Sequence, residues 1–106
     1  MNYKETIKFL YNNLAVYYIN GKRAYKPGLK NIIKLDLALH NPHKNYRIVH
    51  IGGTNGKGTT AHGISRITNS NNIKTGLYTS PHIKDFRERI RVNEKKISKK
   101  YIISFI

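Results

Sequence analysis

A glycine-rich stretch near the middle of the sequence carries the residues with the clearest chemical potential. Glycines let successive backbone N–H groups point into one cradle, and a helix that begins there adds the positive end of its dipole. Lys57 supplies a mobile cation for terminal phosphates, and Thr59 or Thr60 can offer a hydroxyl to a phosphate or to its Mg²⁺. The stretch predicts a nucleoside triphosphate site with Lys57 as its catalytic cation, formed by Gly53, Thr54, Asn55, Gly56, Lys57, Gly58, Thr59 and Thr60.

The loop differs from the most common phosphate-binding motif, in which Gly, four spacers and Gly-Lys are followed at once by Ser or Thr. Here Gly58 separates Lys57 from the first hydroxyl, and Ile51 replaces the first glycine of the motif. The alternative interpretation is a glycine-rich turn with an incidental lysine. The β-branched run before the loop and the helical pattern after it favour the phosphate site.

The elements that must hold this loop can be predicted from its flanks. Residues 47–51 form a compact β-branched run, which is typical of a buried strand. After the loop, Ala61, Ile64 and Ile67 lie on one face of a helix that fades at 69–72, where an asparagine can take the left-handed conformation. Residues 75–79 predict a second strand. Together they predict a right-handed βαβ unit with parallel strands over 46–79.

Further elements lie on both sides of this unit. Residues 3–13 have helical spacing with Asn2 as a candidate cap, and a second helix runs from residue 29 to the stop at Asn41-Pro42. A charged loop over 84–89 precedes an exposed strand at 90–92, and Ser98 can cap a final helix. The sequence therefore predicts an α/β fold: a helical lead-in at 1–45, the βαβ unit at 46–79, and a substrate loop, strand and helix start at 80–106.

The charge of the chain raises the question of a nucleic-acid or membrane partner. The 106 residues include 20 Lys and Arg against 5 Asp and Glu, a net charge of +15. The basic residues are spread from Lys4 to Lys100 without a dense run or a familiar nucleic-acid motif. We therefore expect neither partner, although the charge would attract anionic small molecules. A nucleic-acid binder would instead show DNA affinity that collapses with salt and does not depend on Lys57.

Composition and length set further bounds. A chain of this size forms one small domain with a modest core. The absence of cysteine excludes a disulfide framework and a thiolate zinc site. The sequence has no apolar run of membrane-spanning length and does not start like a secretory signal, so we expect a cytoplasmic protein.

Side chains after the second predicted strand offer more candidates, each with a structural alternative. Ser80 and Pro81 can simply end a strand, and His82 is either a donor in a pocket or a surface imidazole. Arg87 and Arg89 could orient an anionic substrate, but a solvated charged strand accounts for them equally well. The residue types alone leave these alternatives open.

Three blocks of sequence resemble one family. The loop Gly53-Thr54-Asn55-Gly56-Lys57-Gly58-Thr59 looks like the nucleotide loop of folylpolyglutamate and dihydrofolate synthases, within the Mur-type ligases. Residues 76–93, with their Ser80-Pro81-His82 and Arg87-Glu88-Arg89-Ile90 strings, are similar to the family's strand and mobile loop at the substrate pocket. A weaker block is Tyr25-Lys26-Pro27-Gly28-Leu29, followed by Asn41-Pro42-His43. The resemblance covers nearly the whole chain.

This resemblance implies an ATP-dependent ligase that joins a folate or dihydropteroate carboxylate to the amino group of L-glutamate. ATP first converts the carboxylate to an acyl phosphate, so the enzyme mainly aligns the carboxylate with the γ-phosphate and neutralises charge. ATP and Mg²⁺ are the implied cofactors, and we expect a monomer. By the same resemblance Ser80 is a Mg²⁺ ligand, and the implied substrate-binding residues are Tyr25, Lys26, Gly28, His82, Arg87 and Arg89.

The sequence also departs from the family pattern. Glu94 stands where members usually have Gly after the strand's Asn, which weakens the tight hairpin there. The family's later metal ligands, its modified lysine and its glutamate-binding carboxy-terminal domain have no counterpart. We therefore expect a truncated, amino-terminal portion of a Mur-ligase-like ATP-binding domain that is inactive in isolation. The alternatives are a non-catalytic nucleotide-binding module and a fragment of a peptidoglycan-branch Mur ligase.

Overall fold

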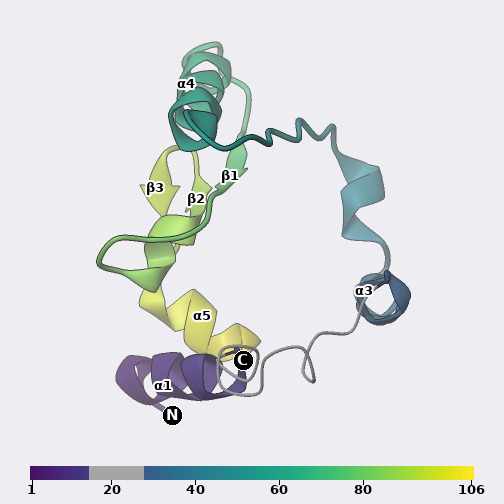
Figure 1. Ribbon diagram of the computed structural model, residues 1–106, viewed down its shortest axis with the longest axis vertical. Coiled ribbons are helices and arrows are strands. Elements are labelled where there is room, and N and C mark those ends of the chain that lie inside the picture. The colour runs from purple at the N-terminus through teal and green to yellow at the C-terminus, as the bar shows by residue number, and fades with distance from the viewer. Residues whose placement is uncertain (15–27) are drawn as a thin grey trace. The chain divides into compact units, whose positions relative to one another are not determined.

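The computed structural model describes residues 1–14 and 28–106, which divide into two compact units (Figure 1). The first unit comprises Met1–Tyr11 and Ile51–Ile106, and the second comprises Asn12–His50. The predictions on Tyr25 and Lys26 lie outside the described residues. No helix of the described ranges is long and apolar enough to cross a membrane.

Helix α1 (Tyr3–Leu14) confirms the predicted amino-terminal helix and its cap. The Asn2 side-chain oxygen accepts a hydrogen bond from the Glu5 backbone N–H at 2.8 Å, and the Glu5 carboxylate accepts one from the Asn2 N–H at 3.0 Å. This reciprocal pair satisfies two donors that a helix start otherwise leaves unpaired. Thr6, which is fully buried, donates its hydroxyl to the Asn2 carbonyl at 2.8 Å.

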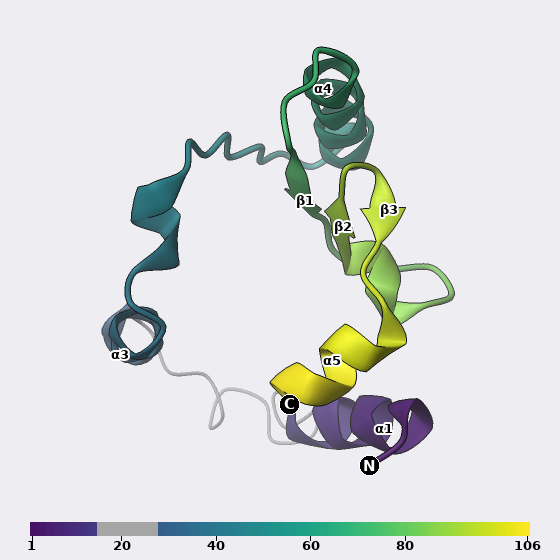
Figure 2. The ribbon, with the colours of Figure 1, turned by 180° about the vertical axis from the view of Figure 1, so that it is seen from behind.

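Helix α5 (Lys99–Phe105) confirms the predicted final helix. The Ser98 hydroxyl caps it by accepting a hydrogen bond from the Tyr101 backbone N–H at 3.1 Å. The Lys99 ammonium lies 5.1 Å from the centre of the Tyr3 ring, and Figures 1 and 2 show α5 beside α1. Ile102 on α5 is buried, so the core of this unit includes the α5 face.

A three-stranded antiparallel sheet occupies the middle of the first unit. Its strands are β1 (Gly76–Tyr78), β2 (Ile90–Val92) and β3 (Lys95–Lys96), in the order β1-β2-β3. Leu77 of β1 lies opposite Arg91 of β2. Figure 2 shows the two strands side by side. The short 3₁₀ helix η3 (Phe86–Arg89) leads into β2. The predicted strands at 75–79 and 90–92 are therefore confirmed.

The predicted βαβ unit with parallel strands over 46–79 is wrong for the described residues. Helix α4 (Lys57–Ser70) is present and ends as expected, with Asn72 in the left-handed region at φ 63°. Residues 47–51, however, form no strand, and the sheet is antiparallel throughout the described chain. A strand needs a neighbour because its backbone N–H and C=O groups must find partners. No described segment pairs with 47–51, and the side chains of Ile48 and Val49 are exposed.

The turn between β2 and β3 holds two non-glycine residues in the left-handed region. Asn93 has φ 50° and Glu94 has φ 68°, and they are the only residues between the paired positions Val92 and Lys95. Two-residue hairpin turns of this kind require positive φ at both positions. The Asn93 side chain accepts a hydrogen bond from the Thr75 backbone N–H at 2.9 Å, which anchors the turn. The hairpin thus forms despite Glu94.

We expect Glu94→Gly to raise the free energy of unfolding by about 1 kcal/mol. A side chain in the left-handed region costs about 1–2 kcal/mol, part of which is offset by the larger entropy that glycine loses on folding. The ion pair that Glu94 forms with Arg66, at 3.6 Å, is solvent-exposed and contributes little. Urea unfolding followed by circular dichroism measures the change. Asn93→Gly is the matched control and should show no gain, because it removes the bond to Thr75. A loss of stability in Glu94→Gly would contradict the prediction.

The second unit contains α3 (Lys30–Ala38) and the 3₁₀ helix η2 (Pro42–Asn45). These confirm the helix predicted from residue 29 and its stop at Asn41-Pro42. Asn41 turns the chain at φ 50°, and the His43 Nδ1 atom lies 2.8 Å from an oxygen of the Asp36 carboxylate. No side chain of α3 is buried.

Candidate functional site

The predicted phosphate loop turns sharply at two glycines before α4 begins. Gly53 has φ +143° and Gly56 has φ +77°, which are backbone conformations that residues with a side chain rarely adopt. Gly56 is the N-cap of α4, and no side chain caps the helix. The Thr60 N–H bonds to the Gly56 carbonyl at 2.9 Å, whereas the earlier N–H groups of a first turn have no carbonyl partner within their helix. The loop therefore presents backbone donors at the positive end of the helix dipole.

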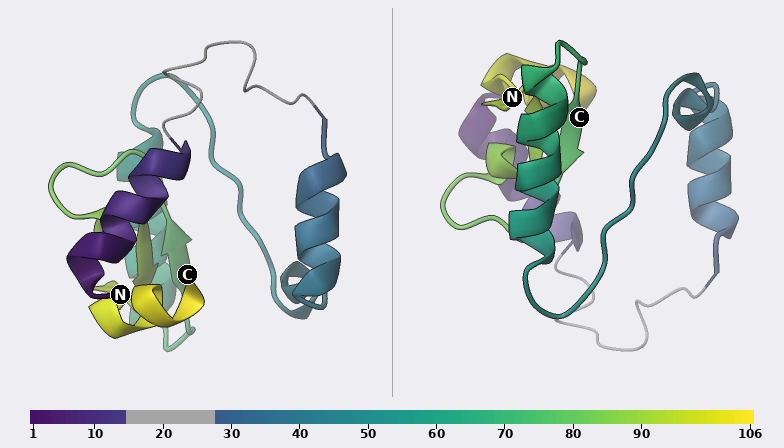
Figure 3. Two further views of the ribbon diagram at one scale, coloured as in Figure 1. Left: turned by 90° about the horizontal axis from the view of Figure 1, so that it is seen from below. Right: turned by 90° about the horizontal axis from the view of Figure 1, so that it is seen from above.

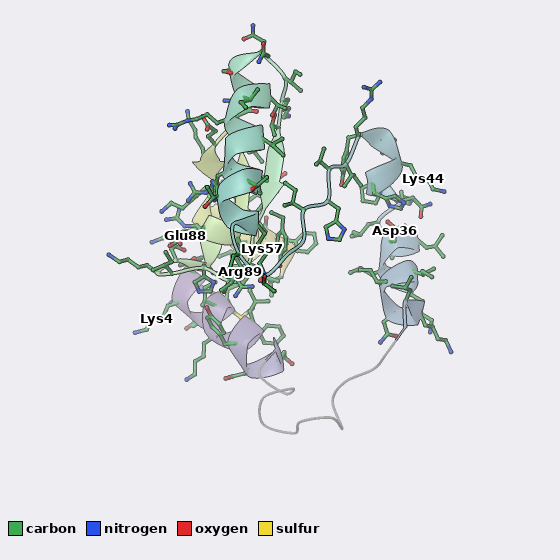
Figure 4. All side chains as sticks on the ribbon, turned by 45° about the horizontal axis from the view of Figure 1, so that its top comes forward. Lys4, Asp36, Lys44, Lys57, Glu88 and Arg89 are labelled. Carbon is green, nitrogen blue, oxygen red and sulfur yellow. The ribbon has the colours of Figure 1, made fainter. Side chains whose placement is uncertain are left out.

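Lys57 is the first residue of α4, and its side chain is exposed. Figure 4 shows it at the amino-terminal end of the helix. An ammonium group and several amide donors at one helix end form a site that suits the oxygens of a phosphate. The remaining predicted nucleotide-binding residues are adjacent and mostly exposed; they are Thr54, Asn55, Gly58, Thr59 and Thr60.

Strand β1 runs back toward the end of α4 that carries the predicted phosphate loop. Helix α4 runs away from the loop and β1 returns beside it, as Figure 3 shows. At the far end, the hydroxyls of Thr68 and Thr75 lie 2.8 Å apart and hold the helix to the start of the strand. Because of this antiparallel course, the chain after β1, from Thr79 onward, continues in the direction of the end of α4 at which Lys57 lies.

Ser80, His82 and Arg89 are joined by hydrogen bonds. The Arg89 Nε–H donates to His82 Nδ1 at 2.7 Å, and a terminal N–H of Arg89 donates to the Ser80 hydroxyl oxygen at 3.4 Å. The other ring nitrogen of His82 lies 2.6 Å from the Tyr11 hydroxyl of α1. The structure therefore brings three of the predicted site residues together and adds a fourth, Tyr11.

Two carboxylates fix the loop that carries these residues. The Glu88 carboxylate accepts hydrogen bonds from the backbone N–H groups of Ile83, Lys84 and Asp85 at 3.1, 3.1 and 2.7 Å. The Asp85 carboxylate in turn accepts a bond from the Arg87 backbone N–H at 3.0 Å, which completes a capping box at the start of η3. Residues 83–88 are thus tied by their own side chains.

Asp85 also joins α1 to η3. Its carboxylate lies 2.9 Å from an Arg87 terminal nitrogen, accepts the Arg87 Nε–H at 3.0 Å, and accepts the Tyr3 hydroxyl at 2.7 Å. The Arg87 side-chain bond is the main reason why the pKa of Asp85 lies well below its usual range. Burial, followed by the bond to Asp85, raises the pKa of Tyr3 to about 12. Arg87 is therefore engaged with Asp85, and its role toward a substrate stays a prediction.

Tyr3, Tyr11 and Asp85 belong to this arrangement but were not predicted as site residues. The string Asp85-Phe86-Arg87-Glu88 matches a capping box and could have revealed the role of Asp85. Nothing in the sequence pairs Tyr11 with His82, 71 residues away. Gly28 turns the chain at φ +97° just before α3 and belongs to the second unit.

The residues near Ser80 fit Mg²⁺ only as a minor part of its coordination. No group of three or more His, Asp and Glu side chains in the described ranges could hold a metal ion. Mg²⁺ commonly takes one or two protein oxygens and completes its shell with water and phosphate oxygens. The Ser80 hydroxyl oxygen, whose bond to Arg89 is long, can be one such ligand. A bound nucleotide would have to supply most of the others.

Relatives of similar sequence and structure point to one family. A probable bifunctional folylpolyglutamate synthase/dihydropteroate synthase of Haloferax volcanii is 37% identical over 106 residues, which is 100% of this chain and 12% of that protein. The crystal structure of folylpolyglutamate synthase from Thermotoga maritima is 42% identical with a TM-score of 0.81 over 96% of this chain and 22% of its own. A folylpolyglutamate synthase complex with AMPPCP and folate is 30% identical with a TM-score of 0.78 over 98% and 24% of the two chains.

The chain belongs to the folylpolyglutamate synthase/dihydrofolate synthase family. No general protein-family model matches it. It spans between about one eighth and one quarter of the length of the three relatives described above. The predicted family is therefore confirmed, and the activity of this chain is a separate question.

Proposed function

We propose that residues 53–60 bind the triphosphate of ATP, and that the chain forms the nucleotide side of a ligase that adds L-glutamate to folate or dihydropteroate. The observation that carries this proposal is the geometry of the loop. Gly53 and Gly56 have positive φ, and the uncapped α4 begins at Lys57. The relative whose structure contains AMPPCP and folate supports the same assignment, because AMPPCP is an analogue of ATP.

In the proposed reaction the residues of this chain mainly position the phosphates and neutralise their charge. The loop amides and Lys57 hold the β- and γ-phosphates, so that the γ-phosphate can pass to the substrate carboxylate. Mg²⁺ supplies charge neutralisation for the phosphates when it is bound, and the Ser80 hydroxyl is one candidate ligand. Arg89 has further N–H groups beyond those that contact His82 and Ser80, and these suit an anionic substrate or phosphate. This transfer leaves ADP, and the glutamate amine would then attack the carbonyl of the acyl phosphate, which forms the amide and releases inorganic phosphate.

A nucleotide-binding module without turnover is the second candidate function. The chain spans only 12% to 24% of the three relatives described above, and it carries the phosphate loop within that share. Both candidates require ATP binding, and only the ligase requires formation of ADP that depends on its other substrates.

Two measurements on the same protein separate these functions. Isothermal titration with AMPPCP in the presence of Mg²⁺ tests binding. A coupled assay for ADP with dihydropteroate or tetrahydrofolate plus glutamate tests turnover, with reactions lacking glutamate as the control. Binding with glutamate-dependent ADP formation supports the ligase, and binding alone supports the module. Failure to bind AMPPCP at millimolar concentration would contradict both.

A further inference from the structure

We propose that Tyr11 of α1 is a positioning residue that, through His82, holds Arg89 and the Ser80 hydroxyl, a candidate Mg²⁺ ligand, in place. This inference rests on the proposed function of the phosphate loop. The resemblance to the family assigns no role to Tyr11. The observation that supports this role is the hydrogen bond between the Tyr11 hydroxyl and the His82 ring.

The direction of each hydrogen bond follows from the chemistry of arginine. A guanidinium group only donates, so His82 Nδ1 must accept the Arg89 Nε–H at 2.7 Å. The hydrogen of the neutral imidazole then resides on Nε2, which donates to the Tyr11 oxygen at 2.6 Å. Arg89 thus selects the tautomer of His82, and the Tyr11 oxygen fixes the orientation of its ring.

The Phe86 ring restricts the same two side chains. The centre of the His82 ring lies 5.8 Å from the centre of the Phe86 ring in an edge-to-face arrangement. The Arg89 guanidinium carbon lies 5.5 Å from the centre of that ring. His82 and Arg89 are both part-buried, so each has limited freedom to turn away.

The planar guanidinium of Arg89 links the orientation of His82 to the position of Ser80. Once its Nε is fixed by His82, the rotation of the plane is set, and the terminal N–H is directed at the Ser80 oxygen 3.4 Å away. This bond is the weakest in the series, so it depends most on the correct placement of Arg89. Removal of the Tyr11 hydroxyl should release His82 first, then Arg89 and Ser80.

Tyr11→Phe tests this chain of contacts because it removes one oxygen and keeps the ring. Nitrogen-15 NMR of the imidazole should show the Nε2-protonated form of His82 in the unaltered protein. In Tyr11→Phe the Nε2 signal should shift and its proton should exchange with water faster. Tyr101→Phe, at an exposed tyrosine of α5, is the matched control and should leave His82 unchanged.

Binding provides the second readout. We expect Tyr11→Phe to weaken the affinity for AMPPCP about 3- to 10-fold when Mg²⁺ is present and less than 2-fold when EDTA removes it, because Lys57 and the loop amides are intact. A shifted His82 signal with this metal-dependent loss supports the proposal. An unchanged His82 signal, or a changed signal without a metal-dependent loss of affinity, overturns it.

The two readouts keep this inference distinct from the proposed function. If the unaltered chain fails to bind AMPPCP at all, the proposed function is wrong and the positioning role falls with it, while the His82 signal still reports whether the contact exists. If the chain binds AMPPCP and Tyr11→Phe binds equally well with and without Mg²⁺, only the positioning role of Tyr11 is wrong.

Discussion

Lys57→Ala should lower the affinity of the chain for ATP, measured in the presence of Mg²⁺, by about 100-fold. This is the largest effect that we expect of any single substitution. Hydrogen bonds to charged groups contribute about 1.5–3 kcal/mol, and 2.7 kcal/mol corresponds to a factor of about 100. The side chain is exposed at the first turn of α4, so the alanine leaves no buried void and the fold should remain. Isothermal titration with AMPPCP measures the loss, and circular dichroism checks the fold.

Lys100→Ala is the matched control for this experiment. It removes the same charge from an exposed position on α5, outside the loop. Because the chain carries a net charge of +15, loss of one charge anywhere should reduce the attraction of an anion slightly. An affinity of Lys57→Ala within 2-fold of that of Lys100→Ala would show that the loop does not use this ammonium group, and the proposed phosphate site would be wrong.

Asp85→Ala is expected to lower the free energy of unfolding by about 2 kcal/mol at neutral pH. The substitution removes the cap of η3, which contributes about 1 kcal/mol, and it leaves Tyr3 and the Arg87 guanidinium without their carboxylate partner. Urea unfolding measures the change. Lys84→Ala, at the exposed preceding position, is the control and should stay within about 0.5 kcal/mol of the unaltered protein.

The contribution of Asp85 should also depend on pH. Its pKa is lower in the folded state than the ordinary value of about 3.9, mainly because the Arg87 side chain donates to it. Its stabilisation is therefore present above about pH 4 and is lost as the pH falls toward the folded pKa. The difference in stability between Asp85→Asn and the unaltered protein should shrink below pH 4. A constant difference down to pH 2 would contradict the assignment.

Tyr3 should show the opposite dependence. Its pKa is raised to about 12, chiefly by burial and then by the bond to Asp85, so the neutral hydroxyl is the form that stabilises the fold. This stabilisation is fully present below the ordinary tyrosine pKa of about 10 and is lost as the pH rises toward 12. Tyr3→Phe should therefore approach the stability of the unaltered protein at alkaline pH.

Local signals in the sequence were sufficient to predict most of the elements. Asn2 and Ser98 both cap helices as predicted, and α3 ends at Ala38, shortly before the predicted stop at Asn41-Pro42. These features depend on hydrogen bonds between residues only a few positions apart, so the sequence carries their partners within each segment. The same holds for Asn72, which takes the left-handed conformation just after α4.

The pairing of strands with one another was harder to predict from the sequence. The β-branched run at 47–51 indicates an extended backbone, but it does not identify a partner strand. The structure pairs β1 with β2 through Leu77 and Arg91, which are distant along the chain and share no recognisable pattern. A short strand forms where its hydrogen bonds are satisfied, and that condition is not local.

The candidate site likewise combines local features, which the sequence predicts, with contacts between distant residues, which it does not. Gly53, Gly56 and Lys57 belong to one short motif, so the residue types and their spacing are enough to predict their chemistry. The contacts of Tyr11 with His82 and of Tyr3 with Asp85 join residues more than 70 positions apart. Such contacts depend on how α1 packs against the loop before β2, and a single sequence does not encode that packing in a readable pattern.

The β-branched segment at 47–51, which pairs with no described strand, affects how the chain behaves in solution. Ile48 and Val49 are 61% and 68% exposed in a β-branched run that no described strand pairs with, and such a run can form a strand with a second copy of the chain. The net charge of +15 keeps copies apart by mutual repulsion, but that repulsion reaches only about 8 Å at physiological ionic strength. Colloidal stability should therefore fall as salt is added, with Arg47 acting as the local gatekeeper against self-association.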